Sequence, residues 1–230
     1  MYPRLVQMLI IGVNSSPRGE ASRTRSLVRA VLDGAASEGA ETEYRDLCSL
    51  RIEYCTGCAS CYATGDCILE DDFFELFARL READGIVFGS PVYIRSVTAQ
   101  LKTFYDRCAD AIHCQMFTGK YGCAVTTSGG GGDEEVIAYM NRVFNMLGGI
   151  AIGGKGVALG QDLEALFPAE AQAGRLGAEL ALAIREKKFY PEQEAIVAET
   201  REHMKNLVTA NKDRWWHEYH YWVEQGWIAE

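Results

Sequence analysis

Four cysteines lie close together in the first half of the chain, at positions Cys55, Cys58, Cys61 and Cys67. The spacing C-x2-C-x2-C-x5-C gathers four thiols in one short loop, where thiolates repel one another unless a soft cation or a covalent bond compensates. Ferredoxin-type iron-sulfur proteins begin their cysteine run with the same C-x2-C-x2-C spacing. The sequence therefore predicts a polynuclear metal centre on these four residues.

Other uses of the same thiols stay open. Zinc held by four cysteines usually takes them from two separated C-x2-C pairs, whereas Cys58 is shared by two overlapping pairs. Zinc is therefore disfavoured, and free thiols or a reversible disulfide are the alternatives to a cluster. The other four cysteines are expected to be small apolar side chains in or near the core, without a chemical role: Cys48, Cys108, Cys114 and Cys123.

A second group of polar residues follows the first apolar segment of the chain. Ser16, Arg18, Ser22 and Thr24 offer hydroxyls and a guanidinium where the next helix exposes unpaired N–H groups, and these groups suit an anion. Four arginines fall within twelve residues of an acidic chain, which favours a phosphate: Arg18, Arg23, Arg25 and Arg29. No G-x-G-x-x-G motif is present, so a mononucleotide fits better than a dinucleotide. A capped surface turn with solvated arginines is the alternative.

Two further loops could form the walls of a site for a planar ring. Pro91, Val92 and Tyr93 follow an apolar segment and offer backbone amides beside one aromatic side chain. The second loop begins with Thr127, Ser128, Gly129 and Gly130 and contains four consecutive glycines at 129–132. Glycines let the backbone approach a ligand closely and donate N–H groups. Such donors would stabilise the negative charge of a reduced flavin. The alternative for the glycine run is a mobile linker.

The elements that must position these loops alternate along the chain. Apolar runs predict strands at residues 8–13, 41–47, 85–89, 121–126 and 149–159, and helical periodicity predicts helices at 22–38, 72–82, 98–111 and 133–147. This alternation indicates an α/β fold with a doubly wound, five-stranded parallel sheet covered on both faces. Ligands bind such sheets beyond the carboxyl ends of the strands, so the loops after the first, third and fourth strands should form the site.

Composition limits the functions available to the chain. It has 230 residues and a net charge of −9, which disfavours nucleic acid as a partner. The longest apolar run is far shorter than the roughly 20 residues of a membrane span, and the first residues lack the pattern of a signal peptide. We therefore expect no membrane partner, a cytoplasmic location and reduced cysteines.

The last forty residues form a separate aromatic segment. Trp215, Tyr219 and Trp222 share one face of an expected helix, and interfaces are enriched in Trp and Tyr. Packing on a neighbouring subunit is favoured over packing on the chain itself. His217 and His220 are expected to be a surface pair. The predicted organisation is a domain over residues 1–188, with a cysteine-rich loop at 48–67, and a helical tail over 189–230 that contacts another subunit.

The motifs together resemble the flavodoxin-like NADPH-dependent FMN reductase family, and within it the iron-sulfur flavoproteins. The resemblance covers the chain to about residue 160. It depends on Ser16-Pro17-Arg18, the four-cysteine loop followed by Asp71-Asp72, the segment Gly89–Tyr93, Gln100-Leu101-Lys102 and Asp106-Arg107. It implies the strand order 2-1-3-4-5. It also implies FMN, with Ser16, Arg18, Ser22 and Thr24 at the phosphate, residues 91–93 beside the isoalloxazine and residues 128–130 at the pyrimidine.

The expected function is electron transfer by FMN and a 4Fe-4S cluster. The donor would be NAD(P)H or a ferredoxin and the acceptor a small molecule such as a quinone or flavin, with no protein side chain needed as an acid or base. A plain NAD(P)H-dependent FMN or quinone reductase with free cysteines is one alternative, and a non-enzymatic redox carrier or sensor is another. Members of the family commonly assemble, so a homodimer or homotetramer is expected.

Overall fold

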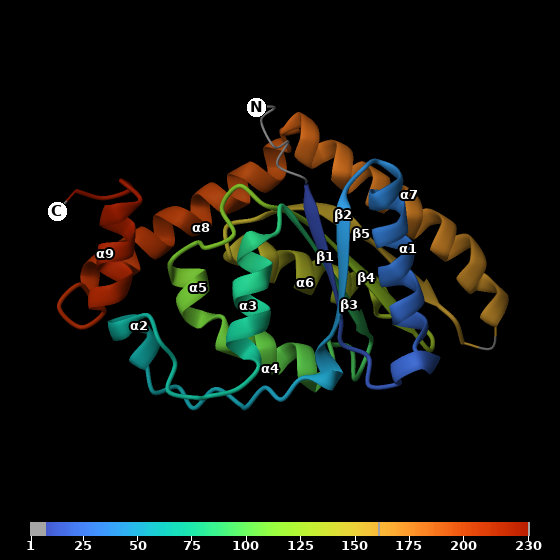
Figure 1. Ribbon diagram of the computed structural model, residues 1–230, viewed down its shortest axis with the longest axis horizontal. Coiled ribbons are helices and arrows are strands. Elements are labelled where there is room, and N and C mark those ends of the chain that lie inside the picture. The colour runs from blue at the N-terminus through green and yellow to red at the C-terminus, as the bar shows by residue number, and fades with distance from the viewer. Residues whose placement is uncertain (1–7, 161, 230) are drawn as a thin grey trace, which may run out of the picture.

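The computed structural model describes residues 8–160 and 162–229. Five strands form one parallel sheet in the order β2-β1-β3-β4-β5 (Figure 1). The strands are β1 (Leu9–Asn14), β2 (Glu41–Asp46), β3 (Gly85–Pro91), β4 (Tyr121–Ser128) and β5 (Ile150–Ala158). The predicted five-stranded parallel sheet and its strand order are confirmed.

Two layers of helices cover the sheet. Helices α1 (Arg23–Ser37) and α7 (Leu166–Glu186) pack on one face, and α3 (Phe73–Glu82), α4 (Ala99–Arg107), α5 (Ala109–His113) and α6 (Asp133–Met146) pack on the other. Short α2 (Ser60–Thr64) lies in the cysteine loop, and 3-10 turns occupy Gly19–Ala21, Leu47–Ser49 and Leu163–Ala165. This arrangement is the doubly wound architecture that the sequence predicts.

The central strands are buried on both faces because alternate side chains point into different layers. In β1, Ile11 faces the layer of α3, α4 and α6, whereas Ile10 faces α1 and α7, and neither side chain is exposed. In β3, Phe88 and Val87 divide in the same way. Continuous apolar runs are typical of strands with this double burial.

Two differences from the expected helices have local causes. The helix expected at 98–111 is two helices, α4 and α5, and at the junction the Cys108 N–H donates to the Tyr105 carbonyl (3.0 Å), three residues back instead of four. The 21-residue α7, which we did not predict, packs closely along α1. A Cβ atom on Gly177 would lie 1.8 Å from the Val31 carbonyl oxygen, so this glycine sets the distance between the two helices.

The C-terminal part contains α8 (Pro191–Ala210) and α9 (Trp216–Glu224), and α9 lies beside α2 of the cysteine loop. Trp222 is buried and donates from Nε1 to the His113 carbonyl (2.9 Å), while the rings of Tyr62 and Trp215 lie 4.9 Å apart. Trp222 and Trp215 of the predicted aromatic face thus contact the chain's own α5 and α2. The subunit contact by the tail stays a prediction.

Within the described ranges, no helix combines the length and the apolar character that crossing a membrane would require.

Candidate functional site

The loops after β1, β3 and β4 are bonded to one another at the carboxyl edge of the sheet. Ser15 Oγ donates to the Gly89 carbonyl (2.9 Å), and Thr98 Oγ1 donates to the Ser15 carbonyl (3.0 Å). The Val92 N–H donates to the Thr127 carbonyl (2.8 Å). These bonds fix the three loops relative to each other before any ligand arrives.

The loops enclose a cavity of about 440 Å³. Nine of the eleven predicted cofactor residues line it: Ser16, Arg18, Thr24, Pro91, Val92, Tyr93, Thr127, Ser128 and Gly129. Ser22 and Gly130 are not among the lining residues. The volume falls within the range of about 300–1,000 Å³ that is usual for ligand and cofactor sites.

The first turn of α1 forms one end of the cavity. Ser22 caps the helix, because its Oγ accepts a hydrogen bond from the Arg25 N–H (3.0 Å). Thr24 Oγ1 lies 2.7 Å from Thr127 Oγ1, and this pair joins the first loop to the fourth strand. Ser22 therefore contributes by fixing the helix end, and Thr24 by lining the wall.

The four arginines of this region divide into two pairs. Arg18 and Arg23 line the cavity. Arg25 and Arg29 place their guanidinium groups over the Tyr44 ring, 5.4 and 4.6 Å from its centroid. Only the first pair therefore offers positive charge to an anion at the end of α1.

Tyr93 begins a tight turn at the rim of the cavity. Its N–H donates to the Ser96 carbonyl (2.9 Å) and its carbonyl accepts from the Ser96 N–H (3.0 Å). Ile94 and Arg95 between them adopt left-handed conformations, with φ of 49° and 58°. This conformation is unfavourable for a β-branched residue, and such strained turns cluster at binding sites.

The glycine run forms an ordered wall. Ser128 Oγ donates to Asp133 Oδ1 (2.9 Å) and accepts from the Gly131 N–H (3.1 Å). Gly131 has a φ of 120°, which an L side chain rarely adopts. A Cβ on Gly129 would meet nothing within 4 Å, so the open space there belongs to the cavity. These bonds give the start of the glycine run a defined conformation.

Sequence reasoning missed the fourth wall. Leu159, Gly160 and Leu163 follow β5 and also line the cavity. The Leu159 N–H donates to the Ser128 carbonyl (2.8 Å), which joins this segment to the glycine run. The sequence could have indicated this segment, because β5 ends at the same edge of the sheet as β4.

The cysteine loop contains little regular structure. Cys55 and Cys58 are exposed, whereas Cys61 and Cys67 are partly buried and line a second cavity of about 230 Å³ with Arg107. Hydrogen bonds from the Ser60 backbone and the Thr56 side chain lower the pKa of Cys58. Burial and nearby acidic groups raise the pKa of Cys61 to about 12. A cation would therefore assist deprotonation most at Cys61.

A buried ion pair closes the base of the loop. Arg107 Nη1 lies 2.6 Å from Asp71 Oδ2, and the two side chains are 1% and 0% exposed. Asp71 also accepts from the Glu53 N–H (2.8 Å) and the Phe73 N–H (3.1 Å), so it bonds to both ends of the loop. Burial opposes the charge on Asp71, but Arg107 and these N–H groups outweigh it and lower the pKa.

The neighbouring residues Asp106 and Arg107 make ion pairs with different partners. Asp106 pairs with Lys102 on the surface of α4 (2.5 Å), while Arg107 turns inward to Asp71. The spacing along the sequence does not reveal that Arg107 pairs with Asp71.

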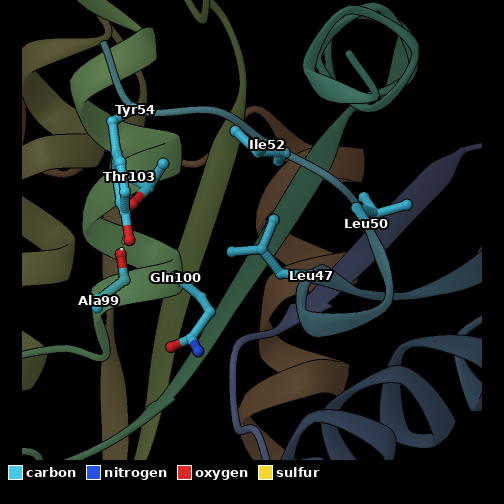
Figure 2. Close-up of a pocket in the computed structure, with 7 residues that line it drawn as sticks. All are labelled: Leu47, Leu50, Ile52, Tyr54, Ala99, Gln100 and Thr103. Atoms are coloured by element: carbon cyan, nitrogen blue, oxygen red, sulfur yellow. Dashed lines mark hydrogen bonds between the residues drawn. The ribbon is translucent and has the colours of Figure 1, made fainter.

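A smaller pocket lies between α4 and the chain leading into the loop (Figure 2). Its lining residues are Leu47, Leu50, Ile52, Tyr54, Ala99, Gln100 and Thr103. Thr103 Oγ1 donates to the Ala99 carbonyl (2.9 Å) within it. At about 120 Å³ it is too small for a flavin, so the larger cavity is the cofactor candidate.

Residues 8–164 match the model of a protein family described as NADPH-dependent FMN reductase. The chain belongs to this family. An iron-sulfur flavoprotein of Archaeoglobus fulgidus is 36% identical over 96% of this chain and 100% of its own length. A second, from Methanocaldococcus jannaschii, is 38% identical over 64% of this chain and 76% of its own. An FMN-dependent NADH:quinone oxidoreductase of Rhizobium meliloti is 30% identical over 72% of this chain and 94% of its own.

Solved structures agree on the fold. A WrbA-like flavodoxin from Agrobacterium tumefaciens superposes with a TM-score of 0.54 at 22% identity, covering 79% of this chain and 100% of its own. An archaeal flavodoxin gives 0.53 at 16% identity, covering 77% and 99%. As a member of the FMN reductase family, in its iron-sulfur flavoprotein subgroup, the chain is a flavin-dependent oxidoreductase.

The residues present fit both groups that this subgroup name implies. The larger cavity joins two guanidinium groups and a helix N-terminus to an aromatic rim. In the loop, the buried Arg107 Nε has no hydrogen-bond partner among the described residues, and the charges of Asp71 and Cys67 outweigh burial and raise the pKa of Arg107. A thiolate at Cys67 would therefore meet a fixed positive charge.

Proposed function

We propose that the protein transfers electrons between NAD(P)H or a ferredoxin and a small-molecule acceptor, through FMN in the larger cavity and a 4Fe-4S cluster on the cysteine loop. The observation that carries the proposal is the convergence of Arg18, Arg23 and the N-terminus of α1 in one cavity with Tyr93. Positive charge at one end and an aromatic rim suit a phosphorylated flavin.

The phosphate would bind at the first turn of α1. Ser16 and Thr24 offer hydroxyl donors there, Arg18 offers a charge-assisted bond, and the cap at Ser22 keeps the helix end in position. The relation of Thr24 to Thr127 places this end next to β4. The chain's contribution is therefore to fix a doubly charged group without a resident metal.

The ring would lie between the turn of residues 91–93 and the start of the glycine run. Pro91, Val92 and Tyr93 supply one wall, and Thr127, Ser128, Gly129 and Gly130 supply backbone groups for the pyrimidine edge. Bound flavin supplies the conversion between two-electron and one-electron transfer, and the protein orients it and tunes its charge.

Cys55, Cys58, Cys61 and Cys67 would ligate the cluster. The two partly buried thiols share a cavity with Arg107, whose charge compensates thiolates, and the two exposed thiols lie on a segment free of regular structure. Four thiolates in one loop are the donor set of a 4Fe-4S centre.

The R. meliloti relative is named an NADH:quinone oxidoreductase, so a quinone is one acceptor to test. We further propose a cytoplasmic location and a homodimer or homotetramer, with residues 1–188 as the flavin domain and 189–230 as an appended tail. Robust NAD(P)H oxidation with a quinone or free flavin would support an enzyme. Absence of turnover, with flavin and cluster both bound, would favour a carrier or sensor.

The phosphate assignment is tested by flavin retention. The double variant Ser16→Ala/Arg18→Ala should weaken FMN binding by at least about 100-fold, since hydrogen bonds to charged groups contribute about 1.5–3 kcal/mol each. Arg25→Ala is the matched control, because this arginine lies over Tyr44 and outside the cavity wall. Equal FMN content in the two proteins would refute the assignment.

The cluster is tested by anaerobic purification with iron and sulfide analysis. We expect about four irons per chain, lost in Cys61→Ser and kept in Cys48→Ser. Cys48 lies outside the loop and serves as the control. Less than about one iron per chain would contradict the cluster and leave the FMN assignment standing.

A further inference from the structure

A second set of metal-ligand atoms lies between α5 and α9, and one of its residues, Asp110, lines the second cavity. Asp110 Oδ1, Cys114 Sγ and His217 Nε2 all lie within 4.8 Å of one another, and in the described part of the chain this is the one such group of three. None of the three belongs to the cysteine loop. Asp110 and Cys114 are one turn apart at α5, and His217 comes from α9 more than a hundred residues later.

The distances are close to those of a tetrahedral site. Cys114 Sγ lies 3.8 Å from Asp110 Oδ1, and His217 Nε2 lies 3.8 Å from the same oxygen. Zinc bond lengths place sulfur and oxygen ligands about 3.6 Å apart, and nitrogen and oxygen ligands about 3.4 Å apart. Small side-chain rotations would therefore close the site around an ion.

The three side chains are held in place and poorly solvated. Cys114 is fully buried, and the side chains of Asp110 and His217 are 13% and 27% exposed. His217 packs against Gly65, where a Cβ would lie 2.7 Å from its Nδ1. The His217 Nε2 atom is buried and has no hydrogen-bond partner among the described residues. A ring nitrogen without a hydrogen-bond partner, next to a carboxylate and a thiol, is available to bind a cation together with them.

The charge balance around the group points the same way. Glu218 is buried beside it, and His113 Nδ1 lies 2.9 Å from its Oε1. Among the ion pairs of the described residues, neither Asp110 nor Glu218 pairs with a lysine or arginine.

We propose that Asp110, Cys114 and His217 bind one divalent transition-metal ion, zinc being the best match, and that this ion joins α9 to α5. One thiolate, one imidazole and one carboxylate suit a borderline-soft ion, and three protein ligands leave a fourth position for water. Because α9 also lies against α2, the ion fixes the tail against the cysteine loop. The site shares no ligand with the proposed cluster, although Asp110 lines the same cavity as Cys61 and Cys67.

The test separates this site from the cysteine loop. The full chain carrying Cys55→Ser and Cys58→Ser is incubated with Zn²⁺, passed through gel filtration, and examined by metal analysis and zinc X-ray absorption. We expect about one zinc per chain with a single sulfur neighbour and the rest nitrogen or oxygen. No retained zinc, or a shell with two or more sulfurs, overturns the proposal.

Variants of the site complete the test. In the same background, Cys114→Ser/His217→Gln should weaken zinc binding by at least about 100-fold, since loss of an outer partner alone costs 10–100-fold. Cys123→Ser/His203→Gln is the control, with one buried cysteine and one exposed histidine that are not part of the group. Flavin content and circular dichroism check folding. If the double variant unfolds, the zinc affinity of the single variant His217→Gln is measured in its place. Unchanged affinity in a folded site variant overturns the proposal.

Discussion

The buried pair of Arg107 and Asp71 gives the sharpest prediction about stability. Replacing Arg107 by Met keeps an unbranched apolar stem but removes the guanidinium, and it leaves the Asp71 carboxylate, 0% exposed, without its counter-ion. Removing one partner of a buried ion pair typically costs about 3–5 kcal/mol, because the remaining charge is left desolvated. We expect a loss of that size at pH 7, a large part of the roughly 5–15 kcal/mol that stabilises a typical domain.

The matched control lies on the same helix. Lys102 pairs with Asp106 at the surface of α4, where the two side chains are 52% and 49% exposed. Lys102→Met should cost less than about 1 kcal/mol, because exposed ion pairs contribute little. Both variants are compared with the parent chain by urea unfolding followed by circular dichroism. Equal losses in the two variants would refute the reasoning.

The pH dependence follows from the direction of the pKa shift. In the parent, the pKa of Asp71 lies below its ordinary value of 3.8, so its contribution to stability is complete above that pH and is lost as the pH falls through the folded-state pKa. Without Arg107, burial dominates and raises the pKa of Asp71. The variant's carboxyl therefore protonates at a higher pH, and the difference in stability between parent and variant should shrink as the medium is acidified from pH 7. A difference independent of pH would contradict this mechanism.

Two further predictions concern the helices and the loop. Gly177→Ala should destabilise the fold by more than about 2 kcal/mol, as overpacking does, because the added Cβ would lie 1.8 Å from the Val31 carbonyl oxygen. At Gly174 the nearest atom is 3.6 Å away, so Gly174→Ala should be neutral or stabilising by up to about 1 kcal/mol. Equal unfolding midpoints for the two variants would contradict the close packing of α1 on α7. In cluster-free protein, Cys58 should be alkylated faster at pH 7 than Cys123. Cys58 is exposed and its pKa is lowered, whereas Cys123 is buried and its pKa is raised. Mass spectrometry of peptides from the alkylated protein gives the order of reaction.

Much of the fold could be predicted because the strands are short apolar runs separated by helical periodicity. Residues 85–89 are a continuous apolar run between glycines, and they form the buried core of β3. The break at Cys108 and the long α7 could not be predicted, since they depend on a local backbone hydrogen bond and on the fit of two glycine-lined helices.

The candidate site divides in the same way. Ser16, Arg18 and Tyr93 could be placed because each follows a strand that ends at one edge of the sheet. The ion pair of Arg107 with Asp71 joins residues 36 positions apart, and spacing alone does not reveal it. His217 was predicted to be a surface residue and is in fact packed against α2 and α5, because the tail folds back on its own chain.

The contact between Tyr62 and Trp215 also bears on the order of events during synthesis. The two residues are about 150 positions apart, and a ribosome adding roughly 5–20 residues per second takes about 8 to 30 seconds to cover that distance. Throughout this interval α2, which carries Cys61, lacks the helix α9 that later lies beside it. This part of the cysteine loop is therefore more accessible to solvent and oxidants until the tail has been made.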